Sequence, residues 1–206
     1  MDINNDGWLD IYVSNDFHED DYYYINQKDG TYKEGIRDHL KHLSRFSMGS
    51  DVADINNDGY QDVMTLDMYP DDEKVEKSSV GEDPLDIYMY KLQFGYFNQY
   101  SRNCLQLNMG GEKFSDIAAS SGVVATDWSW STLMNDYDGD GRKDISYIDA
   151  SNGDEFGAFN VSTMSGSRST VKTVFIRQGN QFVEKDYYLF DPYAKSILPI
   201  LLGRWK

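Results

Sequence analysis

Short apolar stretches with alternating polar positions recur along the whole chain. Three of them, at Ile11–Val13, Val63–Leu66 and Ile145–Ile148, are too short and too rich in β-branched and aromatic residues for helices, so they predict β-strands. Strand-like runs with small residues precede the second and third stretches, at 46–53 and 130–134. The pattern therefore indicates an all-β fold.

A hairpin pattern follows each of these strands at a variable distance. Two short β-prone runs flank a Gly-containing turn at Tyr22–Tyr32, Cys104–Phe114 and Val174–Phe182. One unit is therefore strand, polar segment, strand and hairpin, which gives about four strands. This is the strand content of a β-propeller blade.

The polar segment between the paired strands is an acidic loop that occurs three times. Residues 2–10, 54–62 and 136–144 all read D-x-[DN]-x-D-G-x-x-D. Self-similarity over tens of residues indicates a repeat architecture. We expect a single repeat domain over 1–206 that forms an open arc or a fragment of a larger propeller. Its expected parts are three units and a tail without an assignable pattern, at about 1–45, 46–125, 126–186 and 187–206.

The loop starts are 52 and then 82 residues apart (54 − 2 and 136 − 54), and an insertion at 67–103 accounts for the difference. Its first half, at 71–77, is highly charged and predicts a solvated loop. A short helix is expected near 83–97, with Asp83 as N-cap and Pro84 as the first helical residue. Insertions of this kind lie on one face of a repeat protein and often carry recognition surfaces.

The acidic loops predict calcium sites. Calcium prefers six to eight hard oxygen ligands, which positions 1, 3, 5 and 9 supply from side chains and position 7 from its backbone carbonyl. Gly at position 6 permits the sharp turn. Up to three Ca²⁺ ions are expected. The predicted ligands are Asp2, Asn4, Asp6, Trp8, Asp10, Asp54, Asn56, Asp58, Tyr60, Asp62, Asp136, Asp138, Asp140, Arg142 and Asp144.

Helical calcium loops share the first half of this pattern but need an acidic residue at position 12. Here that position holds Val13, Thr65 and Tyr147, so the β-hairpin form of the loop fits better. The alternative is that Asp, Asn and Gly simply make turns. The third loop carries four Asp and is expected to bind most tightly, although Arg142 and Lys143 oppose this.

Charge and composition narrow the range of partners. With 35 acidic and 19 basic side chains the net charge is −16, which disfavours nucleic acid and anionic lipid. The longest apolar run, at 197–202, is too short to span a bilayer, so no membrane insertion is expected. Cys104 is the only cysteine, which excludes an internal disulfide. Because Met1 directly precedes the first loop, we expect the chain to begin inside a repeat.

The loops, together with Phe46–Gly49, Arg102–Asn108 and Thr126–Trp130, resemble FG-GAP/VCBS-repeat proteins, the integrin-α-like β-propellers. The similarity covers about residues 1–148 and extends to the surface or secreted forms of Bacteroidetes that often carry an ASPIC/UnbV module. It implies a secreted or cell-surface module without catalytic residues, whose calcium loops brace the blades. A protein or glycan ligand is implied, and the rest of a parent chain or another copy would complete the propeller.

Other features carry weaker hypotheses. The alternative function is the propeller portion of a calcium-dependent hydrolase or polysaccharide-active enzyme, but the sequence offers no basic cluster for it. His39 and His42 are expected as a loop pair between blades rather than a zinc site. The run 18–21 is expected to face solvent or add to a cation site. Trp128 and Trp130 are expected on one face, in an inter-blade core rather than in a sugar-stacking site. Asn160–Ser162 fits a glycosylation acceptor.

Overall fold

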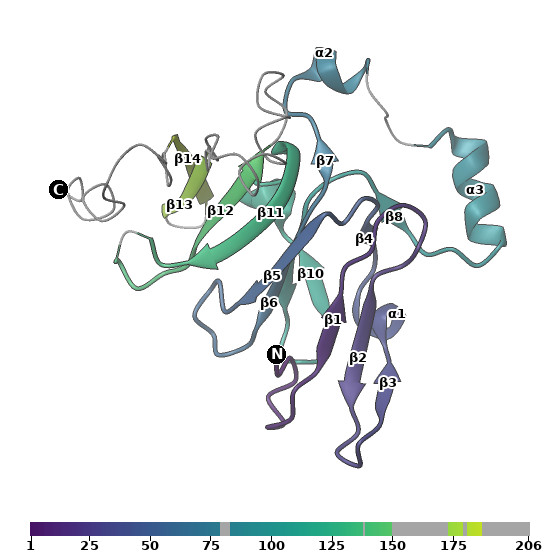
Figure 1. The fold of residues 1–206 in the computed structure, drawn as a ribbon, viewed down its shortest axis with the longest axis vertical. Coiled ribbons are helices and arrows are strands. Elements are labelled where there is room, and N and C mark those ends of the chain that lie inside the picture. Colours follow the sequence, from purple (N-terminus) through teal and green to yellow (C-terminus); the bar gives the residue numbers. More distant parts are fainter. Residues whose placement is uncertain (79–82, 138, 150–172, 179–180, 187–206) are drawn as a thin grey trace, which may run out of the picture.

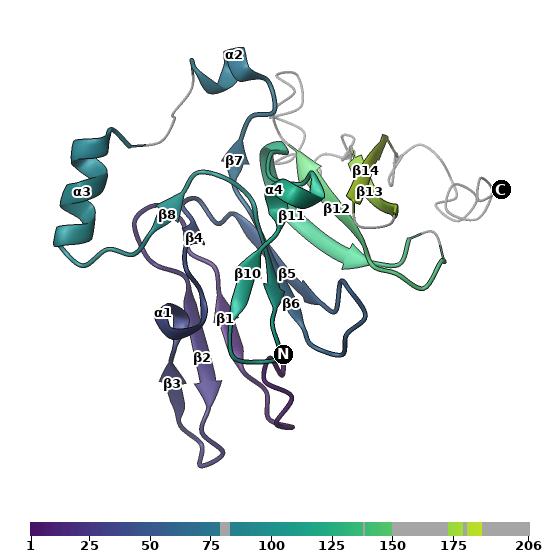
Figure 2. The ribbon, with the colours of Figure 1, turned by 180° about the vertical axis from the view of Figure 1, so that it is seen from behind.

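The computed structural model describes residues 1–78, 83–137, 139–149, 173–178 and 181–186. They form several antiparallel sheets with a few short helices, so the all-β prediction is confirmed (Figure 1). The strands run through both views as successive sheets placed side by side, with the insertion at one end (Figures 1 and 2).

Three sheets correspond to the three repeats. The first has the order β1-β2-β3, the second β10-β9-β6-β5, and the third β14-β13-β12-β11-β7. Every predicted strand and hairpin lies in one of them. Their bounds are β1 Ile11–Val13, β2 Tyr22–Asn26, β3 Tyr32–Glu34, β5 Gly49–Ala53, β6 Asp62–Leu66, β7 Met68–Tyr69, β9 Cys104–Asn108, β10 Phe114–Asp116, β11 Asp127–Asn135, β12 Asp144–Asp149, β13 Thr173–Gln178 and β14 Gln181–Asp186.

The repeats share one register. In the second sheet Asp62 pairs with Ala53 and Asn108 pairs with Phe114, while in the third sheet Asp144 pairs with Asn135. In the first sheet Asn26 pairs with Tyr32 in the same manner as Asn108 with Phe114. The described part of the first sheet has three strands, and the second has the four that the pattern predicts.

The hydrophobic cores lie between neighbouring sheets. Strand β6 is buried along its whole length, and its side chains alternate between two clusters. Val63 packs with Ile3, Tyr23 and other residues of the first unit, whereas Met64 packs with Ile145 of the third unit. The second sheet is therefore a central layer that both neighbours cover.

The insertion contains more regular structure than its charge predicts. The segment 71–77 was expected to be a loop, but it forms helix α2 (Glu73–Glu76), because the Asp72 carboxylate accepts the amides of Lys74 and Val75. The predicted second helix is present as α3 (Leu85–Gln93). Its expected cap was wrong: Pro84 is the N-cap, while Asp83 forms ion pairs with Arg45, at 3.0 Å, and Lys91.

Short elements connect the sheets. They are α1 (Ile36–His39), α4 (Ala118–Ser121), and the parallel pair of β4 (Leu43–Ser44) with β8 (Gln99–Tyr100). Strand β7, from the insertion, pairs antiparallel with β11, so the insertion also extends the third sheet. Among the described residues, no helix is both long and apolar enough to cross a membrane.

The expected inter-blade position of the two tryptophans is wrong for Trp128, which is 41% exposed. A register shift between Ser129 and Ser131 breaks the alternation of β11. The Ser129 side chain is buried instead, where its hydroxyl bonds to the hydroxyl of Thr126, 2.8 Å away.

The two histidines do not pair with each other. The ring of His39 packs edge-on against Tyr23, and His42 Nε2 lies 2.9 Å from the Asp116 carboxylate. In the run 18–21, His18 and Glu19 are exposed as expected, but Asp21 is buried. The expected glycosylation triplet 160–162 and the apolar run 197–202 lie outside the described residues.

Candidate metal centre

The first acidic loop is organised by its position-1 carboxylate. Asp2 accepts the amide of Asp6 at 3.0 Å and the amide of Gly7 at 2.9 Å, one on each oxygen. This closes a tight turn around the carboxylate. The equivalent carboxylates of the other two loops do the same, with bonds from Asp58, Gly59, Asp140 and Gly141 at 3.0, 2.9, 3.1 and 2.9 Å.

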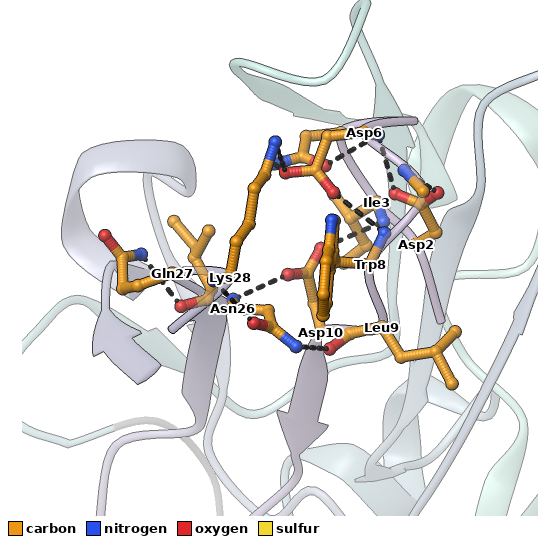
Figure 3. Close-up of polar contacts among 12 residues, drawn as sticks. Asp2, Ile3, Asp6, Trp8, Leu9, Asp10, Asn26, Gln27 and Lys28 are labelled. Atoms are coloured by element: carbon orange, nitrogen blue, oxygen red, sulfur yellow. Dashed lines mark hydrogen bonds and ion pairs between the residues drawn. The ribbon is translucent and has the colours of Figure 1, made fainter. Parts of the chain in front are cut away.

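Positions 3 and 5 face the same space as position 1. In the first loop Asn4 Oδ1 accepts the Asp6 amide at 3.2 Å, and its Nδ2 donates to Asp6 Oδ2 at 3.2 Å. The other oxygen of Asp6 accepts the Trp8 amide at 2.9 Å (Figure 3). The second loop repeats these three contacts with Asn56, Asp58 and Tyr60, at 3.1, 2.8 and 2.8 Å. The sequence-predicted side chains at positions 1, 3 and 5 are thus brought together in both loops.

The carboxylates at position 9 lie in a more buried environment than those at positions 1 and 5. Asp10, Asp62 and Asp144 are all buried. Asp62 accepts the Ile55 amide at 2.8 Å and the Asn108 amide at 2.7 Å, so it fixes the loop to strand β9. Asp10 makes the same two contacts with the amides of Ile3 and Asn26, at 3.1 and 2.9 Å. The carboxylates of Asp10 and Asp62 therefore anchor their loops to a neighbouring strand, and the Asp144 carboxylate accepts the Tyr137 amide at 2.9 Å.

The pKa of Asp62 reflects this crowded setting. Burial raises it to about 6, although the amides of Asn108 and Ile55 oppose the rise, and the nearby Asp58 and Asp54 carboxylates raise it further. A bound divalent cation would relieve this repulsion.

Position 4 is a determinant that the sequence pattern does not reveal, because its role is conformational. Asn5 and Asn57 have φ of 56° and 61°, and Gly139 has φ of 74°. Asn and Gly are the residues that adopt this left-handed conformation readily. Position 4, which the sequence pattern leaves open, is therefore restricted to residues that adopt a left-handed backbone conformation.

The same position links neighbouring loops. Asn5 Nδ2 donates to the carbonyl of Gly59 at 2.8 Å, and Asn57 Nδ2 donates to the carbonyl of Gly141 at 3.0 Å. Each bond joins position 4 of one loop to position 6 of the next. The three loops therefore form a continuous row along one end of the sheets.

Basic side chains approach the position-5 carboxylate in two loops. Lys28 Nζ lies 3.2 Å from Asp6 (Figure 3), and Arg142 Nε lies 4.0 Å from Asp140. Desolvation raises the pKa of Asp6, but the Trp8 amide and Lys28 outweigh it, so this pKa lies below its ordinary value. No basic side chain of the described residues forms an ion pair with Asp58, the equivalent carboxylate of the second loop.

The donor set fits calcium better than a softer metal. The candidate ligand atoms at positions 1, 3, 5 and 9 are carboxylate or amide oxygens. The carboxylates of positions 1 and 5 lie within one turn of each other. Asp138 lies outside the described residues, so the geometry of the third loop is described only from its other positions.

One further cluster contains side chains that could bind a metal ion, but their contacts indicate a structural role. Ligand atoms of His42, Cys104 and Asp116 lie within 4.8 Å of one another. Burial raises the pKa of the Cys104 thiol well above its ordinary value, and the Arg102 guanidinium lies 3.3 Å from His42 and 3.5 Å from Asp116. The positive charge of Arg102 and the hydrogen bond between His42 and Asp116 take the place that a metal ion would have there.

The fold and the loops together define a repeat protein built from blade-like β-sheets, each of which carries an acidic loop directly before one of its strands. The family model described as FG-GAP-like repeat matches residues 2–65, which supports an FG-GAP repeat protein. The matched range contains the whole first sheet and the first two loops. A search of curated proteins finds no match.

Proposed function

We propose that the three loops bind calcium, and that the ions brace the blades of a non-catalytic FG-GAP repeat module. The supporting observation is the shared hydrogen-bond scaffold of the first two loops, which directs the carboxylates of positions 1 and 5 and the amide oxygen of position 3 into one turn. Like charges held this close repel one another, so a divalent cation would stabilise the folded state.

The module would belong to a secreted or cell-surface protein and would bind a protein or glycan ligand. Two observations support a binding role. The net charge of −16 suits calcium-rich surroundings, and the insertion extends away from the sheets at the end opposite the loops (Figure 1).

Calcium titration into the metal-free full chain tests the proposal. For weak sites with Kd on the order of 10⁻⁴ M, calcium at about a hundred times Kd would add roughly 3 kcal/mol of stability per loop. We expect a rise in melting temperature on adding calcium, and its reversal by chelator. An unchanged melting temperature in both conditions would contradict the proposal.

A matched pair of variants assigns the effect to the loops. Asp58→Asn removes one charge from the second loop and should weaken calcium binding there. Asp71→Asn removes the same charge from an exposed position in the insertion and should leave calcium binding unchanged. Equal effects of both variants would point to general electrostatic attraction instead of sites.

A further inference from the structure

The side chain of Asn108, on strand β9, contacts both of the first two acidic loops. It is buried, and its Nδ2 donates to the carbonyl of Gln61 in the second loop at 3.1 Å and to the carbonyl of Ile3 in the first loop at 2.9 Å. The backbone amide of Asn108 donates to the Asp62 carboxylate at 2.7 Å. Both side-chain amide hydrogens of Asn108 are therefore used, one for each loop.

The residues at the equivalent position of the other two sheets differ from Asn108. In the first sheet the register places Asn26 there, and its Nδ2 donates to the Leu9 carbonyl of its own loop at 3.1 Å. The other described side-chain bonds of Asn26 stay within its own hairpin. In the third sheet the register places Arg177 at this position. Of the two Asn side chains, only that of Asn108 reaches a second loop in the described part of the chain.

The first two loops also bond to each other directly. The Asp2 amide donates to Gln61 Oε1 at 3.0 Å, and Asn5 Nδ2 donates to the Gly59 carbonyl at 2.8 Å. Both bonds end on or beside a predicted ligand, since Asp2 is position 1 of its loop and Gly59 lies between positions 5 and 7. An arrangement of one loop that fits an ion therefore also fixes backbone atoms of the other loop.

Building on the calcium binding proposed above, we propose that the first two loops form a coupled pair of calcium sites, with Asn108 as the positioning residue that links them. Each of these loops carries three Asp, whose mutual repulsion opposes the closed arrangement when no ion is bound. Ordering of one loop fixes its carbonyl acceptor, Ile3 or Gln61, and through Asn108 it restrains the other loop. The second loop then loses less conformational freedom on binding, which gives positive cooperativity.

Repulsion between two bound ions would give coupling of the opposite sign. It is screened by salt, with a Debye length of about 8 Å at physiological ionic strength, whereas the contacts of a buried side chain such as Asn108 are not. At this ionic strength we therefore expect occupation of either loop to strengthen calcium binding at the other by about tenfold. The factor must be the same in both directions, because coupling between binding sites is reciprocal.

Calorimetric calcium titrations of the full chain measure this coupling at physiological ionic strength. Asp140→Asn neutralises position 5 of the third loop in every protein compared. Adding Asp6→Asn or Asp58→Asn then leaves one of the first two loops as the strong site. The coupling factor is the product of the two binding constants of the two-loop protein divided by the product of the single-loop constants. We expect a factor of about ten.

A matched pair of variants assigns the coupling to Asn108. Asn108→Ala removes the side chain that bonds to both loops and should reduce the factor to about one. Asn26→Ala removes the equivalent side chain, whose described bonds stay within the first unit. It should weaken calcium binding at the first loop and leave the coupling factor unchanged. A purely structural role of Asn108 would lower stability or affinity without changing this factor.

Because Asn108 is buried, a second variant tests the coupling from an exposed turn. Asn5→Gly removes the direct bond to the Gly59 carbonyl, and Gly accepts the φ of 56° at this position. We expect the coupling factor to fall severalfold while the protein remains folded by circular dichroism. This variant decides the outcome if Asn108→Ala does not fold.

The possible results separate the coupling from calcium binding itself. No calcium binding by either single-loop protein would contradict the proposed function and the coupled pair together. Calcium binding with a coupling factor of one or less would overturn the coupled pair and leave the individual sites in place. A factor that Asn108→Ala or Asn5→Gly leaves unchanged would do the same. An equal fall in the factor with Asn26→Ala would exclude Asn108 as the specific link.

Discussion

The side-chain amide of Asn57 donates to the backbone carbonyl of Gly141, 3.0 Å away, and the same bond joins Asn5 to Gly59 at 2.8 Å. Residues 84 positions apart in the sequence are thereby joined at the turns of two neighbouring loops. The loops stabilise one another as well as their own hairpins, and this coupling can be measured.

Asn57→Gly isolates that coupling, because Gly accepts the φ of 61° but has no side-chain donor. We expect a loss of about 1 kcal/mol from the missing hydrogen bond and up to about 1 kcal/mol more from backbone entropy. Asn57→Ala should cost more, since it adds left-handed strain. Urea unfolding of both variants gives the values, and equal stability of Asn57→Gly and the parent would show that the bond contributes nothing.

Lys28→Gln should strengthen calcium binding at the first loop. The Lys28 ammonium, 3.2 Å from Asp6, competes with a cation for that carboxylate. Because the pair is partly exposed, the gain should be modest, about twofold to fivefold in Kd. Calorimetric titration measures it. Lys33→Gln, on the exposed strand β3, removes the same charge without an ion pair in the loop and serves as the control.

Asp21 predicts a specific pH dependence. Burial raises its pKa to about 6, although the amide of Asn15 and the hydroxyls of Tyr12 and Ser47 oppose the rise. A raised carboxyl pKa makes the folded state bind the proton more tightly than the unfolded state. Asp21 therefore contributes its full stabilisation of the folded state below about pH 4. This stabilisation is lost as the pH rises through about 6, which lowers the free energy of unfolding by on the order of 2 to 3 kcal/mol.

Asp21→Asn should remove this dependence, and the second repeat indicates that the fold tolerates it. There Asn103, also buried, accepts the Asp67 amide at 2.7 Å, as Asp21 accepts the Asn15 amide at 2.8 Å. Urea unfolding of parent and variant between pH 4 and 7 makes the comparison. Parallel stability curves would show that Asp21 does not titrate in this range.

Gly49→Ala should destabilise the contact between the second and third sheets. The new Cβ would lie 2.6 Å from the Trp130 carbonyl oxygen and 3.0 Å from Ser131 Cα, both backbone atoms that cannot move independently. We expect a cost of about 1 to 3 kcal/mol in thermal unfolding. Ser50→Ala, the next residue on the same strand, is the control and should cost far less.

Local sequence patterns predict most of the fold. Alternation and Gly-containing turns predicted the strands of the three sheets except β7, which lies in the insertion, because both signals act within a few residues. The misses arise from contacts that the pattern does not contain. Trp128 is exposed because a bulge at 129–131 changes the alternation, and 71–77 contains a helix because Asp72 caps it. The role of Asn5 and Asn57 depends on partners more than fifty residues away.

The insertion lies at the opposite end of the sheets from the loops, because β6 runs away from Asp62 and β9 returns to it. The second unit can therefore hold thirty more residues than the first between successive loops (82 − 52) while the row of hydrogen-bonded turns stays in step. Mutation and selection can lengthen or rewrite one pole of the molecule without disturbing the other. Diversity among relatives should accumulate at the insertion end, and invariance at positions 4 and 6 of the loops.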